Sequence, residues 1–181
     1  ASAKIFTDNV EQLVISQVME VLNHPIFEGA SVRIQADTHA GKGCVIGFTC
    51  KDAKGVIPNL VGVDISCGMH SVNLGKIDID LKSLDDYITQ KIPNGGKINK
   101  RVDTSLTSGH EQFKSEVKAI SEKTNTEYFR HLKSIGSLGG GNHFIEINED
   151  KNGDKWLVIH SGSRNFGLQI AKYHQALAEK Y

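Results

Sequence analysis

Residues 139–165 read GGGNHFIEINEDKNGDKWLVIHSGSRN, and the rest of the chain is organised around this stretch. Two runs rich in strand-forming residues, HFIEI and KWLVIH, flank a polar segment that contains Asn152-Gly153. An Asn-Gly pair between two such runs is a strong short-range signal for a β-hairpin. The stretch therefore predicts a hairpin with a histidine near the open end of each strand, His143 and His160.

The position of the turn decides whether these two histidines meet. If the loop centres between Lys151 and Asn152, His143 lies directly opposite His160, with Cβ atoms about 4.5–5.5 Å apart. That spacing suits two imidazoles that bind one metal ion or two adjacent ions, because a histidine nitrogen lies about 2 Å from a zinc-like ion. A two-residue Asn-Gly loop would instead pair His143 with Gly162. The hairpin alone leaves both registers open, and it leaves open that no metal is involved.

Composition excludes several classes of protein. The 181 residues carry 21 basic and 21 acidic side chains, so overall charge gives no attraction to polyanions and any such site must be local. The length fits one domain, at a prior of about 150 residues per domain. No apolar run approaches the roughly 18 residues of a membrane span, and the polar N-terminus lacks the apolar core of a signal peptide. Three cysteines in such a chain predict thiols or metal ligands rather than disulfides, and we expect a cytoplasmic protein.

The remaining patterns predict helices around several strands. Asp8 and Glu11 have the spacing of a capping box, and the apolar period that follows predicts a helix ending near Asn23. Asp80 is the expected cap of a second helix. Further helices are expected within 108–135, interrupted at 124–126, and after 167; strands are expected over 32–36, 44–49, 56–63 and 72–74. The expected fold class is α+β, with mixed or antiparallel sheets flanked by helices, and His131 is expected on a solvated helix face.

A second cluster of chemically active residues follows the third expected strand. Asp64 and Cys67 are three residues apart, just before a glycine, so a tight loop could turn both side chains toward one point. A thiolate beside a carboxylate is unfavourable unless a cation lies between them. The pattern D-x-x-C is weak by itself, and chance occurrence is a competing explanation.

Two glycine-containing loops are further candidates. Asp37, His39 and Lys42 follow a strand end, where functional residues are common, although Asp37 could simply satisfy backbone amides in a turn. The loop after His160 opens a helix and carries Arg164, so its free amides and guanidinium could bind an anion. Ordinary helix capping is the alternative for that second loop.

Taken together, these motifs closely resemble the N-terminal half of the RtcB family of RNA ligases, which repair and splice RNA. The order is DTHAGKG at 37–43, VGVDISCGM at 61–69, SLGGGNHFIEI at 137–147 and IHSGSR at 159–164. The similarity extends over essentially the whole chain. It implies that residues 1–181 are the N-terminal part of a single RtcB-like catalytic domain, an incomplete fold without its C-terminal part.

The resemblance implies a site with two divalent metal ions, usually manganese. Asp64, Cys67 and His143 match ligands of one ion, and the cysteine matches the residue that bridges both ions. His160 matches a ligand of the second ion. Arg164 matches the arginine near the RNA phosphate, and together with Cys67 and His143 it forms the implied catalytic set.

The resemblance also implies a nucleotide and a reaction. The implied cofactors are Mn²⁺ and GTP, and the implied partner is RNA whose 3′-phosphate or 2′,3′-cyclic phosphate is joined to a 5′-hydroxyl end. The segment that matches the guanosine-nucleotide contacts comprises Asn142, His143, Phe144, Ile145 and Glu146. By ligand type alone zinc would be as plausible as manganese. A metal-dependent phosphoesterase, a non-catalytic metal- or anion-binding module and a structural zinc site are the rival interpretations.

The sequence departs from the family pattern in places. Ser66 and Asn165 stand where glycine is usual, and Gly140 stands where many members have threonine. Asparagine tolerates left-handed backbone better than most residues, so the loop at Asn165 can form. Family members are about twice as long, and nothing here matches the histidine that becomes guanylylated. We therefore expect a fragment or half of a split enzyme, inactive in guanylylation when isolated, whose partner is the C-terminal half or an activating protein.

Overall fold

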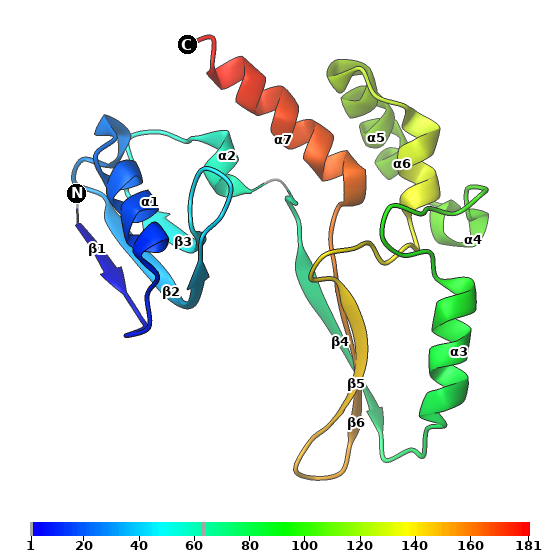
Figure 1. Cartoon of the computed structure of the whole chain (residues 1–181). Coiled ribbons are helices and arrows are strands. Elements are labelled where there is room, and N and C mark those ends of the chain that lie inside the picture. Colours follow the sequence, from blue (N-terminus) through cyan, green and yellow to red (C-terminus); the bar gives the residue numbers. More distant parts are fainter. Residues whose placement is uncertain (1, 63) are drawn as a thin grey trace. The chain divides into compact units, whose positions relative to one another are not determined.

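The computed structural model of the protein describes residues 2–62 and 64–181 (Figure 1). It has the expected α+β composition, with helices and two small sheets. The chain divides into two compact units, Ala1–Gly62 with Gln175–Tyr181, and Val63–His174. The prediction of one catalytic domain over 1–181 stays a prediction. Within the described residues, no helix combines the length and the apolar character that a membrane crossing requires.

The first unit is a three-stranded mixed sheet with one covering helix. Strand β2 lies in the middle, pairing in parallel with β1 and antiparallel with β3. The helix α1 spans Gln12–Leu22 and ends at Asn23, as expected. The strands are β1 (Ser2–Ile5), β2 (Ser31–His39) and β3 (Ile46–Lys51).

The core of this unit joins α1 to β2. Val14 of the helix and Val32 and Ile34 of the strand are completely buried. Phe27, from the short 3₁₀ turn Pro25–Phe27, packs edge to face on Phe48 with ring centroids 5.7 Å apart. Full burial of an aliphatic side chain of this size stabilises a fold by about 1.5–3 kcal/mol, so a few such contacts hold the helix on the sheet.

Two predictions for this unit are wrong. Glu11, not Asp8, precedes the first turn of α1, and it makes no capping hydrogen bond with its side chain. The strand expected over 56–63 is instead the short helix α2, Pro58–Val61. Proline is well tolerated in a first helical turn because its fixed φ suits that position and no amide is lost. Val63, at the end of the expected strand, lies outside the described residues.

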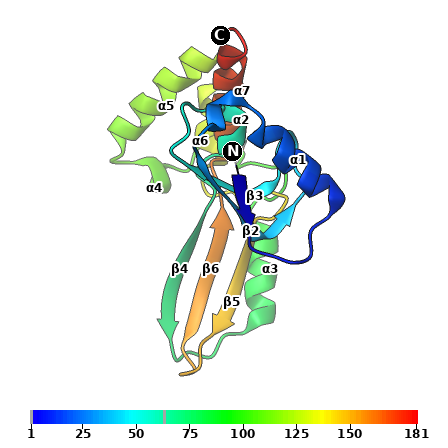
Figure 2. The same ribbon diagram turned by 90° about the vertical axis from the view of Figure 1, so that its left-hand side faces the viewer.

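The second unit contains an antiparallel sheet in the order β4-β6-β5 (Figure 2). Strand β6 is central, with β4 and β5 on its two edges. Pairing of β4 with β6 therefore brings the segment after Cys67 next to the second strand of the hairpin. The strands are β4 (Gly68–Gly75), β5 (Phe144–Glu149) and β6 (Lys155–Ser161).

The hairpin forms, but its register matches neither expected alternative. Phe144, not His143, lies opposite His160, and the last pair is Glu149 with Lys155. The turn is closed by Asp150, whose carboxylate accepts hydrogen bonds from the amides of Asn152 and Asp154 and from Trp156 Nε1. An aspartate that binds the amides two residues ahead is a common way to close a turn, and here it selects a loop longer than the two-residue Asn-Gly turn.

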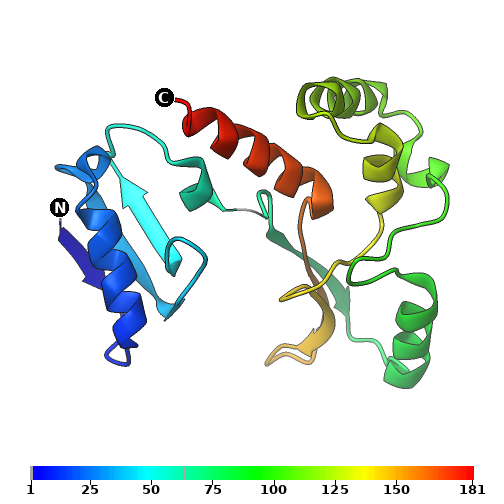
Figure 3. The same ribbon diagram turned by 45° about the horizontal axis from the view of Figure 1, so that its top comes forward.

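Helices complete the second unit, and α5 and α6 pack against each other (Figures 1 and 3). Asp80 caps α3 as expected, accepting from the amides of Lys82 and Ser83. Asn125 ends α5 in the left-handed conformation, which explains the expected interruption at 124–126. The helices are α3 (Leu81–Lys91), α4 (Thr104–Thr107), α5 (Glu111–Thr124), α6 (Tyr128–Ser134) and α7 (Arg164–Ala178).

The prediction of a solvated face for His131 is wrong. This histidine of α6 is 4% exposed, and its ring lies 4.7 Å from that of Phe166. Its Nε2 forms a hydrogen bond with Thr126 Oγ1 at 2.8 Å, whereas its buried Nδ1 has no hydrogen-bond partner among the described residues. Burial lowers the pKa of His131, and nearby Arg130 lowers it further against the opposing effect of Glu127.

We predict that Ile34→Ala lowers the free energy of unfolding of the first unit by about 2–5 kcal/mol, because it leaves a cavity in a fully buried position. The measurement is urea unfolding followed by circular dichroism. Ile46→Ala is the matched control, since Ile46 is 49% exposed on the neighbouring strand. Equal losses for the two variants would contradict the assignment of the core.

We predict that the second unit loses stability in acid partly through His131. An unfolded histidine takes up a proton near pH 6.5, whereas the lowered pKa of the folded residue resists it. The stability that the neutral, buried His131 contributes is therefore fully present above about pH 6.5. It is lost as the pH falls through 6.5 toward the lowered pKa of the folded residue. His131→Gln should reduce the acid-induced fall in the urea midpoint, followed by fluorescence of Trp156. Exposed His110→Gln should leave that fall unchanged.

Candidate metal centre

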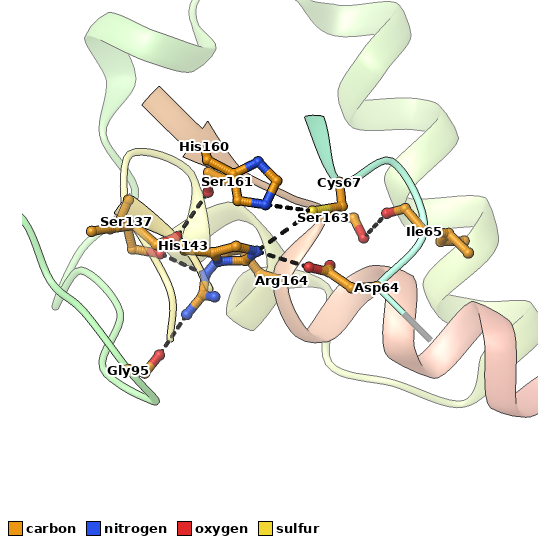
Figure 4. A network of polar contacts seen from close by, with 11 residues as sticks. Asp64, Ile65, Cys67, Gly95, Ser137, His143, His160, Ser161, Ser163 and Arg164 are labelled. Carbon is orange, nitrogen blue, oxygen red and sulfur yellow. Dashed lines mark hydrogen bonds and ion pairs between the residues drawn. The ribbon is translucent and has the colours of Figure 1, made fainter. Parts of the chain in front are cut away.

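Three segments of the second unit bring ligand-type side chains together (Figure 4). Cys67 comes from the turn before β4, His143 from the turn before β5, and His160 from β6. One ligand atom from each of these residues lies within 4.8 Å of the others. His143 and His160 are 76 and 93 positions from Cys67 in the chain, so the sheet, not the local sequence, assembles the cluster.

The distances in the cluster fit a bound cation. Cys67 Sγ lies 3.2 Å from His160 Nε2 and 3.9 Å from His143 Nε2. A tetrahedral ion with bonds of about 2.0 Å to nitrogen and 2.3 Å to sulfur separates two such ligands by roughly 3.5 Å. The observed separations bracket that value, so one ion could lie between each pair, with Cys67 shared.

The fourth predicted ligand, Asp64, joins the cluster through His143. Its Oδ2 lies 2.8 Å from His143 Nε2. The turn that carries it is closed by the Cys67 amide, which donates to the Asp64 carbonyl at 3.2 Å. Ser66 lies inside this turn with φ of 63°, the left-handed region that favours glycine. The four predicted metal ligands, Asp64, Cys67, His143 and His160, are therefore close neighbours.

The hydrogen bonds of His143 leave room for a cation. Its Nδ1 lies 3.0 Å from the carbonyl oxygen of Leu138, which can only accept, so Nδ1 carries the proton. A neutral imidazole in that tautomer presents a lone pair at Nε2 to the Asp64 carboxylate, 2.8 Å away. Two facing acceptors repel unless a proton or a metal ion lies between them. A metal-binding histidine usually donates a hydrogen bond from the N–H of its other ring nitrogen to such a carbonyl.

His160 is held by its neighbours' rings. Its ring centroid lies 5.5 Å from those of Phe144 and His143. The buried Nδ1 of His160 has no hydrogen-bond partner among the described residues. His160 therefore lacks, among the described residues, the hydrogen bond that a metal-binding histidine usually makes through its other ring nitrogen. Its Nε2 faces Cys67 and is the atom available to bind an ion.

The surroundings of Cys67 make its thiol a weaker acid. Burial raises its pKa, and the charge of Asp64 and a hydrogen bond to it raise the pKa further. The metal-free thiol therefore stays protonated at neutral pH. A cation between Cys67 and Asp64 would reverse this effect, because it stabilises thiolate and carboxylate together.

Arg164 lies beside the cluster, at the start of α7. Its Nη2 donates to the Gly95 carbonyl at 2.6 Å and its Nε donates to Ser137 Oγ at 3.3 Å. Arg164 has φ of 58°, so the residue that takes the left-handed conformation in this loop is Arg164; Asn165, expected there, is the second residue of α7. Burial lowers the pKa of Arg164, and Asp64 opposes that shift.

Close packing explains two glycines around the cluster. A Cβ atom on Gly162 would lie 2.6 Å from an Asp64 carboxylate oxygen. A Cβ atom on Gly139, which has φ of 102°, would lie 2.2 Å from His143 Nδ1. Both backbones approach the ligands too closely for any side chain, so a larger residue at either position would displace the metal ligands.

The predicted nucleotide segment, 142–146, runs from the turn into β5. Phe144 and Glu146 alternate onto the same face of the sheet as His160, while Ile145 faces the other way. Glu146 is exposed and accepts from Asn148 Nδ2 at 2.8 Å, and Asn142 is exposed in the turn. No observation tests nucleotide binding by this segment, and it stays a prediction.

The third expected locus lies in the first unit. Asp37 and His39 lie at the C-terminal end of β2, and His39 Nδ1 lies 3.0 Å from the Asp37 carbonyl oxygen. Lys42 follows in the loop before β3. These contacts are local, and a functional role for this loop stays a prediction.

Sequence reasoning missed the residues that hold the ligands in place. The Leu138 carbonyl accepts from His143 and also from Ser161 Oγ at 2.8 Å. Ser163 Oγ donates to the Ile65 carbonyl and so ties α7 to the turn that carries Cys67. Small polar residues beside the motif histidines were the available signal, but their partners depend on the fold.

The α+β fold and this cluster define the class of the protein. It is an α+β protein whose candidate metal site combines thiol, imidazole and carboxylate ligands beside an arginine. The family profile described as tRNA-splicing ligase RtcB matches residues 17–181. The chain belongs to the RtcB family, as its motifs predicted.

Named relatives agree with this membership. The chain is 32% identical to RNA-splicing ligase RtcB of Escherichia coli (strain K12) over 82% of its own length and 40% of that protein. It is 31% identical to tRNA-splicing ligase RtcB of Methanococcus maripaludis over 98% of its own length and 47% of that protein. The chain therefore spans less than half the length of the curated relatives it matches.

We predict that Cys67→Ala weakens manganese or zinc binding by at least about 100-fold, because the variant loses the ligand that lies close to both histidines. Isothermal titration calorimetry on the full chain measures this loss. Cys50→Ala is the control, since Cys50 is an exposed free thiol outside the cluster. Unchanged affinity in Cys67→Ala would contradict the candidate site, and loss of folding without metal would indicate a structural zinc site.

Proposed function

We propose that this chain contributes most of the metal ligands, and the phosphate-binding arginine, of a GTP- and metal-dependent RNA ligase. That ligase would join an RNA 3′-phosphate or 2′,3′-cyclic phosphate to a 5′-hydroxyl. The observation that carries the proposal is the position of Cys67 Sγ, within 3.9 Å of both His143 and His160. Membership of a family named for RNA splicing supports the substrate class.

Two ions would share the cysteine. Asp64, Cys67 and His143 would hold one ion, and Cys67 with His160 would hold a second, weaker one. When bound, divalent ions would stabilise negative charge on phosphoryl oxygens, and GTP would activate the RNA phosphate. Thiolate and imidazole ligands suit manganese and zinc alike; we propose manganese because of the family resemblance.

The residues around the ions would bind and orient the RNA end. Arg164 is fixed through Nε and Nη2, and guanidinium groups bind phosphate oxygens in a fork. Since Gly95 and Ser137 position this arginine, it would lose little conformational freedom when it binds a phosphate. Phe144 and Glu146, on the face of His160, would contribute to the nucleotide side of the site.

A metal-dependent phosphoesterase is the second candidate. It would use the same ligands and the same arginine and would need no GTP. The feature that favours it is that Cys67, His143 and His160 lie within ligand distance of one another and beside Arg164, with no part of this arrangement supplied by a nucleotide. The two candidates differ in whether RNA ends are hydrolysed in metal alone.

We predict that the manganese-loaded chain binds RNA ending in a 3′-phosphate at least about tenfold more tightly than the same RNA ending in a 3′-hydroxyl. Arg164→Gln should remove that preference, and exposed Arg101→Gln should keep it. Fluorescence anisotropy with end-labelled RNA makes the measurement. Hydrolysis of a 2′,3′-cyclic end without GTP would favour the phosphoesterase, and equal affinity for both ends would contradict an RNA-end site.

With labelled GTP and manganese, we expect no covalent guanylate on these 181 residues, since none matches the guanylylated histidine. A labelled chain would contradict this part of the proposal.

A further inference from the structure

The segment that joins α3 to α4 concentrates positive charge (Figure 1). Between positions 87 and 102 the sequence contains Lys91, Lys97, Lys100 and Arg101, and no acidic residue. All four basic residues are exposed. Because the whole chain carries no net charge, this concentration is a local feature of one surface.

Neighbouring carboxylates do not neutralise this charge. None of the four basic side chains forms an ion pair with a described acidic side chain. The acidic residues on either side of the segment are engaged within their own helices. Asp86 pairs with Lys82 at 3.0 Å, and Asp103 caps α4 by accepting from the Ser105 amide at 2.9 Å. The positive charge therefore faces solvent without a counter-charge among the described residues.

The segment also forms a cavity of about 520 Å³ with the last turn of α3, within the second unit. Lys91, Lys97 and Lys100 line this cavity, together with neutral side chains that can donate hydrogen bonds, among them Gln90 and Asn94. The lining includes no acidic residue. A concave surface lined by one sign of charge concentrates the electric field and attracts ions of the opposite sign, so this cavity suits an anion.

Hydrogen bonds to the chain between α6 and β5 hold the segment in place. The Gly95 amide donates to the Gly139 carbonyl at 2.7 Å. Asn99 Nδ2 donates to the Ile135 carbonyl at 2.8 Å. A segment that is already ordered loses little conformational freedom when it binds a ligand, so its lysines are presented from a fixed backbone.

The same segment contacts the arginine beside the candidate metal centre. The Gly95 carbonyl accepts from Arg164 Nη2 at 2.6 Å (Figure 4). Asn94, the preceding residue, lines the cavity. Consecutive Cα atoms are about 3.8 Å apart, so the cavity begins next to the residue that holds Arg164. An extended polyanion bound at Arg164 could therefore continue into the cavity.

We infer that this cavity binds the phosphate backbone of RNA next to the reacting end, with Lys91, Lys97 and Lys100 as its cationic contacts. A lysine ammonium acts on phosphate as a point charge. Contacts to phosphate position a nucleic acid without reading its bases, so this site is independent of RNA sequence. The inference rests on the proposed ligase function and deepens it, because it extends the RNA contact beyond the reacting phosphate.

The test is the salt dependence of RNA binding by the manganese-loaded full chain. Fluorescence anisotropy measures the affinity for single-stranded RNA with a 3′-phosphate over roughly 50–200 mM salt. Each phosphate contact to a single strand contributes about 0.7 to the slope of log affinity against log salt. Lys97→Gln combined with Lys100→Gln should therefore reduce the slope by about 1.4 and weaken binding by at least about tenfold at low salt.

A second pair of substitutions controls for net charge. Lys76→Gln combined with Lys151→Gln removes the same charge from exposed positions outside the segment. This control pair should leave the slope unchanged, because neither lysine lines the cavity. A slope for Lys97→Gln with Lys100→Gln equal to that of the control pair would overturn the backbone site and leave the ligase proposal intact.

The preference for a 3′-phosphate over a 3′-hydroxyl separates this inference from the proposed function. The variant with both cavity lysines replaced should keep that preference and its manganese affinity, since both depend on the metal centre and Arg164. Absence of the preference in the unsubstituted chain would overturn the ligase proposal, whereas the slope would still decide the backbone site. Displacement of RNA by poly-glutamate as effectively as by unlabelled RNA of equal charge would overturn the nucleic-acid partner in favour of an acidic protein.

Discussion

The carbonyl oxygen of Leu138 accepts hydrogen bonds from both His143 Nδ1 and Ser161 Oγ. These two residues lie at the open end of the hairpin, one before β5 and one at the end of β6. This shared acceptor fixes the tautomer of His143. It also holds Ser161, the residue that follows His160. Pairing of β4 with β6 then delivers Cys67 to the same place. The cluster thus depends on sheet geometry and a single peptide group more than on any direct contact between its members.

The cluster is electrostatically frustrated by itself. A carboxylate, a thiol of raised pKa and an imidazole lone pair face one another, with Arg164 at the side. Such a group is unfavourable unless a positive charge enters it, and structures keep frustration of this kind mainly at sites that bind ligands. Asp64 also lines a pocket of about 340 Å³ beside the cluster.

Local signals in the sequence predicted two helix boundaries where a side chain acts on its own backbone, although the capping box expected at Asp8 and Glu11 does not form. Asp80 caps α3, and Asn125 separates α5 from α6. The motifs also identified residues that the fold brings together. The hairpin register was missed by one residue, because Asp150 closes a longer loop than Asn152-Gly153 suggests.

Other errors have a tertiary origin. The run 56–63 contains strand-forming residues, but Pro58 begins a short helix there. The polar context of His131 predicted exposure, whereas tertiary packing that includes Phe166 buries it. Partners such as Leu138 and Gly95 act through backbone carbonyls, and every residue has one. No residue type at these positions could have marked them in advance.

Ser66 occupies left-handed backbone immediately before the shared cysteine. A residue with a side chain pays about 1–2 kcal/mol there relative to an ordinary conformation, and glycine would largely escape that penalty. Serine at this position therefore strains the turn that precedes Cys67. The residue at position 66 consequently affects how rigidly the Cys67 thiol is held, while the identity of the ligands stays the same.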